Sequence, residues 1–297
     1  MAYILGTKKR STLNGTDKFF LLLFGAGAVF LCYSLLQAMH DLSFSRLLSY
    51  LLRVDGQGNF QAGSLLQGLF MTLRVSLWCL VLAFASGFFV GIVSAHKKGL
   101  ASLPSKLYVL TLRNMPPLIL LFLVFFFASS ILTEWLMGIE YSLAKSPYRA
   151  WFYLFVAPEG QLDRMTACVL TLGLYEGAYI AEIVRAGIES VPHGQWEAGR
   201  ASGLSPWQIR RHIVIPQTLR QSLAPLAGQS ISIVKDSAIA SIISLQELTF
   251  QSMELMNVTG RTVELWILTA LLYYCLCVCL EKISRKWENS IQWKPLH

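Results

Sequence analysis

Charged side chains are scarce in this chain, and the scarcity is local. Only 14% of its 297 residues are Asp, Glu, Lys or Arg, whereas an average soluble domain has about 25%. Phe19–Met39 and Val75–Ala95 each run for 21 residues without a charge, and Asn114–Thr133 runs for 20. A helix needs roughly 20 apolar residues to cross the hydrocarbon core of a bilayer. The sequence therefore predicts a membrane protein rather than a soluble one.

Motifs for metal, nucleotide and catalytic sites are also missing. The six cysteines all lie in apolar segments and form no CxxC or Cys/His spacing, which argues against a metal site. No GxxxxGK[ST] loop is present, so we expect no nucleotide site in this chain. The five histidines lie in predicted loops or at the end, and no nucleophile has a base beside it. A membrane enzyme is the least favoured of the function classes, and the chain is predicted to hold no cofactor.

Six membrane spans are predicted from the apolar segments. They cover about 19–39, 68–95, 108–133, 165–188, 223–248 and 262–281. Lys8, Lys9 and Arg10 precede the first span, as in a signal peptide, but its apolar run is longer than the roughly 7–15 residues of a cleaved leader. We interpret it as a retained anchor.

The distribution of lysine and arginine predicts the orientation of these spans. With both termini in the cytoplasm, the inner segments hold 16 of these residues and the outer loops hold 6, as the positive-inside rule requires. The net charge of +8 thus reports membrane orientation and does not indicate a nucleic-acid partner. The outer loop at 134–164 contains Trp151, Phe152 and Tyr153, and aromatic side chains favour the membrane interface.

One polar, basic segment, 194–216, lies between apolar spans on the predicted cytoplasmic side. A short helix is expected from Trp196 to Ser202, ended by Gly203, because glycine readily adopts the left-handed conformation that follows a helix. Ser205 and Gln208 form a capping-box pattern for a second helix that runs until the approach to Pro216. Apolar contacts are expected from three side chains, Trp207, Ile209 and Ile213. Two capped helices joined at a glycine favour docking to a protein, although an amphipathic helix lying on anionic lipid is an alternative.

The same segment carries a resemblance to a known family. From Glu197 it reads E-A-G, then Gly203, then Ile213-x-Ile215-Pro216, and it resembles the EAA loop of bacterial ABC importer permeases. Gly199 stands where that loop has alanine, and Ile215 where it has leucine. The flanking GAYIAEIVRAGIESVPHGQWEA looks like the polar amino acid branch, and Lys235-Asp236-Ser237 and Arg113-Asn114-Met115-Pro116 resemble its K-D-T-S and R-G-T-P motifs. The matches extend over about 68–284.

The resemblance implies an all-α membrane protein, the permease subunit of a type I importer for a polar amino acid or an amino-acid-like solute. It implies no enzyme activity in this chain: ATP and Mg²⁺ would be bound by a separate ATPase dimer. Other implied partners are a second permease, identical or homologous, an external solute-binding protein and the lipid of the bacterial inner membrane. The expected organisation is a cytoplasmic segment, a first span, a five-helix domain with the EAA loop, and a cytoplasmic tail: 1–18, 19–39, 66–284 and 285–297.

Two groups of site residues follow from this interpretation. The residues expected to couple the chain to the ATPase lie in the EAA loop: Glu197, Ala198, Arg200, Gly203, Arg210, Arg211, Ile213 and Pro216. Those assigned to the pathway or its gate are Arg74, Glu176, Tyr179, Glu182, Lys235, Asp236 and Ser237.

Charges at membrane depth are costly and mark either internal ion pairs or solute contacts. Glu182 and Arg185 are three apart and are expected to pair on one helix face. Lys235 and Asp236 are each expected to have an ionic partner on another helix. Glu176 and Arg74 could together receive a zwitterion, or Glu176 could bond to another helix while Arg74 reaches outward.

Two further points concern packing and mechanism. Gly87 and Gly91 form a G-x-x-x-G pattern, which allows another helix to approach closely. An ion-driven secondary transporter remains the main alternative function, but it leaves the capped helix pair unexplained and commonly shows inverted repeats, of which we see none. The sequence does not identify the solute, and both a homodimer and a heterodimer of permeases stay open.

Overall fold

The structure is a computed structural model that describes residues 15–40, 49–54, 58–95 and 102–292. The chain divides into two compact units, Met1–Leu48 and Ser49–His297. In the first unit, helix α1 (Gly15–His40) covers the predicted first span. Several basic residues used to predict orientation lie outside the described residues: Lys8, Lys9, Arg10, Arg46, Lys97, Lys98 and Lys294.

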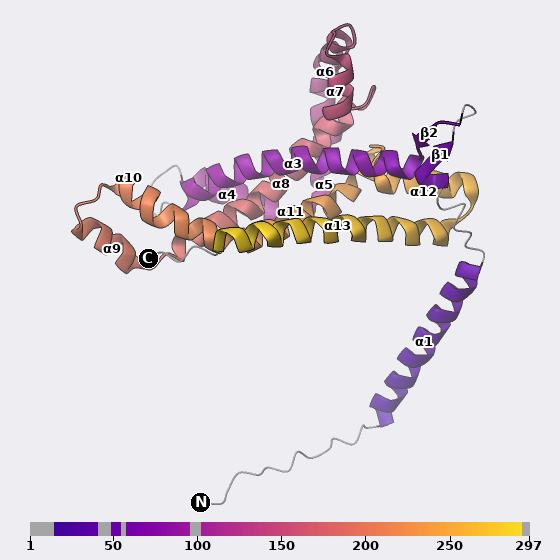
Figure 1. The fold of residues 1–297 in the computed structure, drawn as a ribbon, viewed down its shortest axis with the longest axis horizontal. Helices are drawn as coiled ribbons and strands as arrows, with labels where there is room; N and C mark the ends of the chain where they lie inside the picture. Colours follow the sequence, from indigo (N-terminus) through magenta and orange to yellow (C-terminus); the bar gives the residue numbers. More distant parts are fainter. Residues whose placement is uncertain (1–14, 41–48, 55–57, 96–101, 293–297) are drawn as a thin grey trace, which may run out of the picture. The chain divides into compact units, whose positions relative to one another are not determined.

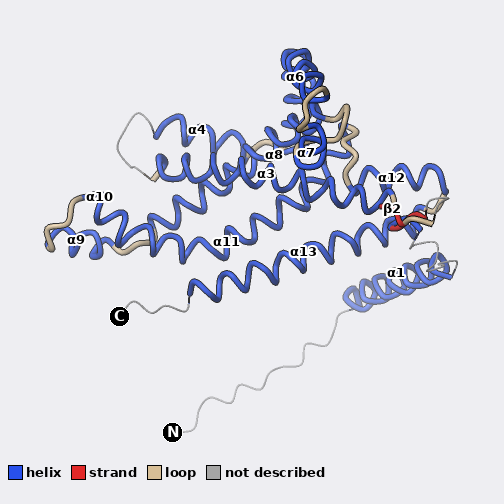
Figure 2. Tube along the Cα trace, turned by 45° about the horizontal axis from the view of Figure 1, so that its top comes forward, coloured by secondary structure: helices blue, strands red, loops and turns tan. Residues whose placement is uncertain are grey.

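The second unit is helical apart from one short hairpin, in which β1 (Leu52–Val54) pairs antiparallel with β2 (Phe60–Ala62). Its helices are α3 (Ser64–Ser94), α4 (Ser102–Arg113), α5 (Pro117–Leu123), α6 (Ser129–Ala144), α7 (Arg149–Phe155), α8 (Leu162–Glu189), α9 (His193–Ala201), α10 (Pro206–Ile209), α11 (Ile215–Asp236), α12 (Leu248–Thr259) and α13 (Thr262–Gln292). Helices α3, α8, α11 and α13 run side by side (Figures 1 and 2).

Small residues bring α3 and α8 into close contact. A Cβ on Gly87 would lie 2.6 Å from the Cβ of Ile180, and one on Gly91 would lie 2.7 Å from the carbonyl oxygen of Ala181. The predicted close approach at the G-x-x-x-G pattern is therefore confirmed, and α8 is the helix that makes it. Cys79 faces Cys168 nearer the start of both helices, so α3 and α8 are parallel. The part of the chain that connects α3 to α8 must therefore run back to the end of the unit at which both helices begin.

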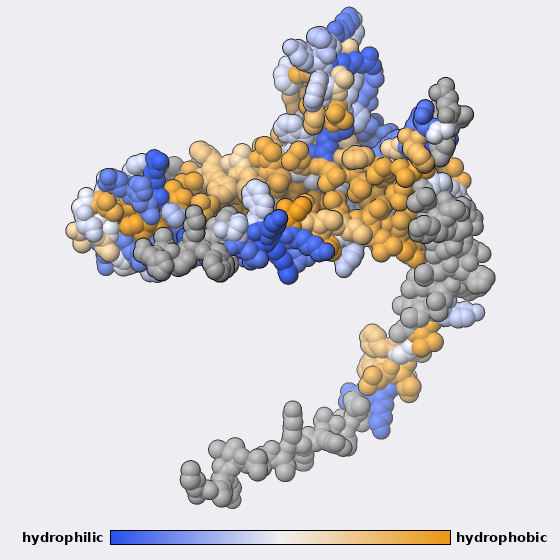
Figure 3. Space-filling model, viewed as in Figure 1, coloured by the Kyte–Doolittle hydropathy of each residue, from blue (hydrophilic) through white to orange (hydrophobic). Residues whose placement is uncertain are grey.

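Three described helices are long and apolar enough to span a membrane, and a bent pair makes a fourth candidate. The three are α3, α8 and α13, and the pair consists of α4 and the segment Pro117–Phe127. Figure 3 shows apolar side chains over α3 and the first part of α13, and polar side chains at the end that carries α9 and α10. Large hydrophobic side chains of α3 and α13, among them Phe70, Leu77, Trp266 and Leu271, are well exposed. Such a surface matches the hydrocarbon core of a bilayer.

The predicted third span, 108–133, is not a straight helix. The chain bends by 107° between α4 and the helical segment Pro117–Phe127. Pro116 has an extended backbone, with φ −62° and ψ 132°, and Pro117 begins α5. A proline disfavours helical geometry in the residue before it and cannot donate a backbone hydrogen bond, so the two consecutive prolines break the span here. A π-helical turn over Val124–Ala128 then joins α5 to α6.

The prediction of one continuous fifth span over 223–248 is wrong. Helix α11 starts earlier and ends at Asp236, a 3₁₀ turn covers Ser237–Ile243, and Ser244 is left-handed at φ 59°. Glu247 then caps α12: its carboxylate accepts hydrogen bonds from the backbone N–H groups of Thr249 (2.9 Å) and Phe250 (2.8 Å). The cap satisfies the free N–H groups of a new helix, so a second element begins where one span was expected.

The segment 134–164, predicted as an outer loop, is largely helical. Helix α6 continues to Ala144, and α7 follows after a short turn. The two project together from the side of the neighbouring helices (Figure 1). Trp151 stacks on Phe155 with ring centroids 5.4 Å apart, and the indole N–H of Trp78 donates to the carbonyl oxygen of Phe155 at 2.9 Å. These contacts attach α7 to α3.

Candidate functional site

Two caps fix the turn between α9 and α10. Gly203 is left-handed at φ 74°. The N–H of Leu204 donates to the carbonyl of Gly199 at 3.1 Å, and that of Gly203 donates to the carbonyl of Arg200 at 3.0 Å. These two bonds form a Schellman motif. The predicted capping box is also confirmed, since Ser205 and Gln208 exchange side-chain and backbone hydrogen bonds of 3.3 and 2.8 Å.

A small apolar core holds this helix pair together. Val191, Ile209 and Val214 are buried, with Trp196 and Ile213 packed against them. Gly199 is buried in α9, and a Cβ there would lie 2.9 Å from Cγ1 of Ile209. Gly199 therefore allows α10 to approach α9 closely. We call the whole segment His193–Val214 the coupling element, after the role that the sequence resemblance predicts for it.

Its exposed face carries the charges. Glu197, Arg200, Arg210 and Arg211 are all exposed, as are Ala198 and Gly203, whereas Ile213 and Pro216 are half-buried. Of the three side chains expected to make apolar contacts, Ile209 is buried and Ile213 half-buried within the pair, whereas Trp207 is 64% exposed. An exposed tryptophan beside two arginines is typical of a surface that binds another macromolecule.

The second helix of the pair does not end before Pro216. A π-helical turn over Arg210–Val214 connects α10 directly to α11, which begins at Ile215. Proline can occupy the first turn of a helix because it needs no N–H donor there, and the wider π turn before it accommodates its ring. The coupling element is thus continuous with α11.

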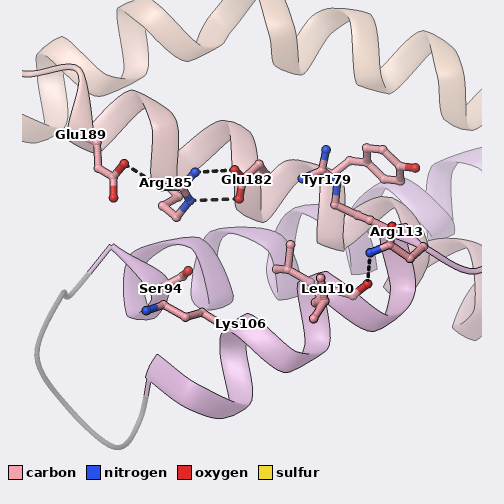
Figure 4. A pocket seen from close by; sticks show the side chains of 10 residues that line it. Ser94, Lys106, Leu110, Arg113, Tyr179, Glu182, Arg185 and Glu189 are labelled. Carbon is pink, nitrogen blue, oxygen red and sulfur yellow. Dashed lines mark hydrogen bonds and ion pairs between the residues drawn. The ribbon is translucent and has the colours of Figure 1, made fainter.

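A charged groove of about 800 Å³ lies between α4 and α8 (Figure 4). Its lining includes Lys106 and Arg113 from α4, and Tyr179, Glu182, Arg185 and Glu189 from α8. The predicted pairing of Glu182 with Arg185 is confirmed, with Nε of Arg185 3.0 Å from a carboxylate oxygen of Glu182. Arg185 also bonds to Glu189 at 2.6 Å. One guanidinium is therefore shared by two carboxylates.

Arg113 lies at the opposite side of this groove, where α4 ends at the bend. Its guanidinium carbon is 5.0 Å from the centre of the Tyr179 ring. The Tyr179 hydroxyl in turn lies 3.1 Å from that of Tyr175. Sequence reasoning noted Arg113 within a family motif and as a basic residue at membrane depth but gave it no role, and the signal that could have identified it is its place just before the helix-breaking Pro116-Pro117 pair.

Glu176 is buried at 1% exposure between α8 and α11. The side-chain amide of Gln229 donates a hydrogen bond to its carboxylate, and the carboxyl group of Asp236 lies beside it. Of the two sequence interpretations of Glu176, a bond to another helix is the one that the structure shows.

The expected ion pairs of Lys235 and Asp236 are absent from the described residues. Lys235 is exposed and Asp236 half-buried, and the neighbour of Asp236 is another carboxyl group. Ser237 is fully buried and donates to the carbonyl of Val234 at 2.7 Å. This bond lies at the end of α11, and the assignment of Ser237 to the pathway or its gate stays a prediction.

Arg74 is far from Glu176. It lines a separate cavity of about 750 Å³ with Tyr153, Gln161 and Gln246. Glu176 is followed by Gly177, which faces Ser86 of α3, and Ser86 is twelve residues beyond Arg74, or roughly 18 Å along a helix axis. A single amino acid cannot span that separation, so the hypothesis of one zwitterion held by both residues is wrong.

Comparison with known proteins agrees with this architecture. Residues 87–288 match the family described as the binding-protein-dependent transport system inner membrane component. The chain belongs to this family. It is 31% identical to the probable amino-acid ABC transporter permease protein YckA of Bacillus subtilis, over 78% of this chain and 89% of that protein. It is 28% identical to the glutamine transport system permease protein GlnP of Escherichia coli, over 74% and 90%.

Solved structures show the same fold. An amino acid ABC transporter crystallised with histidines matches with a TM-score of 0.61 and 26% identity, over 76% of this chain and 94% of that one. The inward-facing methionine transporter MetNI matches with a TM-score of 0.59 and 20% identity, over 77% and 96%. The chain is therefore a membrane-embedded permease component of an ABC importer.

Proposed function

We propose that this permease forms half of the translocation pathway of an ATP-driven importer and couples to its ATPase through the coupling element. The observation that carries the proposal is the rigid α9–α10 pair, which is capped on both sides of Gly203 and exposes Glu197, Arg200, Arg210 and Arg211. A capped pair with its own core keeps its shape when force is applied to it. Continuity with α11 gives a direct mechanical path from that surface into the helices of the second unit.

The proposed assembly has four kinds of partner. An ATPase dimer, which binds ATP and Mg²⁺, docks on the coupling elements of two permeases. The second permease is identical or homologous, and an external solute-binding protein delivers the solute. The permease crosses the inner membrane six times, with α1, α3, the bent α4–α5 segment, α8, α11 with its following turn, and α13. Residues 1–18 and 285–297 are cytoplasmic, although α13 continues to Gln292.

The proposed solute is a polar amino acid or an amino-acid-like compound. Relatives named for amino-acid, glutamine and L-cystine transport support this class. The groove supports it too, because both signs of charge line one opening between α4 and α8. A zwitterion needs a cationic and an anionic contact.

Uptake by the reconstituted importer tests this function. The permease, its ATPase, its sister permease and its binding protein would be placed in proteoliposomes, with labelled L-glutamine, L-histidine and L-cystine as probes. We expect uptake of at least one probe that requires internal ATP and survives collapse of ion gradients by ionophores. Uptake that persists without ATP and stops with the ionophore would instead identify an ion-driven transporter.

A further inference from the structure

Some of the charged side chains that line the groove form ion pairs, and others form none with the described residues. Arg185 is bonded to Glu182 and Glu189, so these three residues together carry one net negative charge. Lys106 and Arg113 add two positive charges from α4. The groove therefore has a net positive charge, and its unpaired cations come from the α4 side.

Arg113 is the better placed of the two cations. In the described residues its guanidinium has no ion pair, and its one recorded ring contact is with Tyr179. A ring beneath a guanidinium fixes its plane and leaves the N–H groups at its edge able to donate. Both cations are exposed, but Lys106 is a point charge on a flexible stem, whereas the guanidinium of Arg113 is planar and lies over the Tyr179 ring. Arg113 thus presents a preorganised fork for a planar anion.

The backbone at Arg113 gives a second argument. The chain turns by 107° directly after it, and Asn114 uses its amide to bond the free carbonyl of Leu110 at 2.7 Å. A break in a membrane helix is tolerated where the irregular backbone is buried in protein or lines a cavity, and transporters form solute sites at such breaks. The end of α4 is therefore both exposed to the groove and held in place.

We infer that Arg113 binds the carboxylate of the transported solute, with Tyr179 as the platform beneath its guanidinium. This inference rests on the proposed function, because it assumes that the groove belongs to the solute pathway. A carboxylate accepts two parallel N–H bonds from a guanidinium. Glu182 lies near enough to Arg113 for their charges to interact, and it provides the negative charge that the ammonium group of the same solute requires.

Equilibrium binding to the purified, nucleotide-free importer in nanodiscs tests the inference. The probes are labelled L-glutamine, L-histidine and L-cystine, and the variants are Arg113→Gln, Arg113→Lys and Lys106→Gln. We expect Arg113→Gln to weaken binding by between about ten- and a hundredfold, as for loss of a charged hydrogen-bond pair. Arg113→Lys keeps the charge but not the fork, and its affinity should fall between those of the wild type and Arg113→Gln. Lys106→Gln should weaken binding by no more than about fivefold, because a single ammonium group on a flexible stem cannot donate the bidentate pair that a carboxylate accepts from a guanidinium.

Copurification of the ATPase with the permease separates the possible failures. The amount of bound ATPase should stay within about twofold of the wild type in every variant, because Arg113 lies at the end of α4 and outside the coupling element. Wild-type affinity in both Arg113 variants would overturn the inference and leave the proposed function standing. If Arg113→Gln does not assemble, Arg113→Lys decides, because it preserves size and charge. A wild-type complex that binds none of the probes would overturn the inference together with the proposed amino-acid solute.

Discussion

Gly199 and Ile209 touch across the turn that joins α9 to α10, so closely that a Cβ on Gly199 would lie 2.9 Å from Cγ1 of Ile209. Glycine costs up to about 1 kcal/mol relative to alanine in a helix, and Gly199 stands where the EAA loop has alanine. The structure shows its packing role. The close contact places Arg200 on one helix and Arg210 on the other in a fixed relation.

Enlarging Gly199 should therefore separate the two helices. Gly199→Val places a branched side chain against Ile209 and should cost about 1–3 kcal/mol by overpacking. We expect the amount of ATPase that copurifies with the permease to fall several-fold. Gly194→Ala is the matched control, because no atom lies within 4 Å of a Cβ at Gly194. Equal loss in both variants would show that α9 responds to any change and that the contact is not the cause.

The left-handed turn at Gly203 gives a second, independent test. Gly203→Val should destabilise the turn by about 1–2 kcal/mol, because a β-branched residue resists φ 74°. Gly203→Asn should retain most of the wild-type activity, since asparagine tolerates that conformation and no atom would touch its Cβ. ATP-dependent uptake in proteoliposomes is the measurement. Asparagine and valine variants with the same activity would argue that this backbone conformation is unimportant.

Glu176 should stabilise the contact between α8 and α11 rather than bind solute. Glu176→Gln keeps an acceptor for the amide of Gln229 and should leave affinity for the amino-acid probes within about twofold. Glu176→Leu leaves Gln229 without its partner and should lower stability by about 1–3 kcal/mol. Thermal unfolding in detergent, followed by size-exclusion chromatography, compares the two. A large loss of solute affinity in Glu176→Gln would contradict this structural role.

Glu247 should be essential to the start of α12. It is fully buried and accepts hydrogen bonds from two backbone N–H groups and from the hydroxyl of Tyr273 at 2.8 Å. Glu247→Ala should lower the free energy of unfolding by about 1–3 kcal/mol, through loss of the cap and an unsatisfied hydroxyl. Glu254→Gln, on the exposed side of the same helix, is the control and should change stability little. The same thermal assay measures both.

The coupling element could be predicted from the sequence because its determinants are local. The glycine at 203 and the Ser205–Gln208 capping box act within a few residues, and both appear in the structure as expected. The pairing of Glu182 with Arg185 follows in the same way from helical spacing. The close approach of another helix at Gly87 and Gly91 was expected from the pattern of small residues, whereas its identity as α8 and its parallel direction came from the structure.

Tertiary features were harder to predict. An apolar run in the sequence does not show that one helix ends at Asp236 and that another begins after Glu247. The hydrogen bonds of the Glu247 cap are completed by Thr72 and Tyr273, which are far from Glu247 in sequence. The same reasoning mistook Lys235 and Asp236 for ion-paired residues. The presence of both charges at membrane depth also suggested a joint role for Arg74 and Glu176, although about twelve residues along α3 separate Arg74 from the position beside Glu176.

Affinity purification of the permease from native membranes in a mild detergent, with the wild type, Gly203→Val and Gly203→Asn compared, tests the central claim most directly. We predict that an ATPase and a second permease copurify with the wild type and with Gly203→Asn, and that the ATPase is lost from Gly203→Val. The contrary result is an ATPase bound equally to all three, or a permease that purifies alone and still drives ion-dependent uptake. Either would show that the coupling element is not the surface on which the ATPase docks.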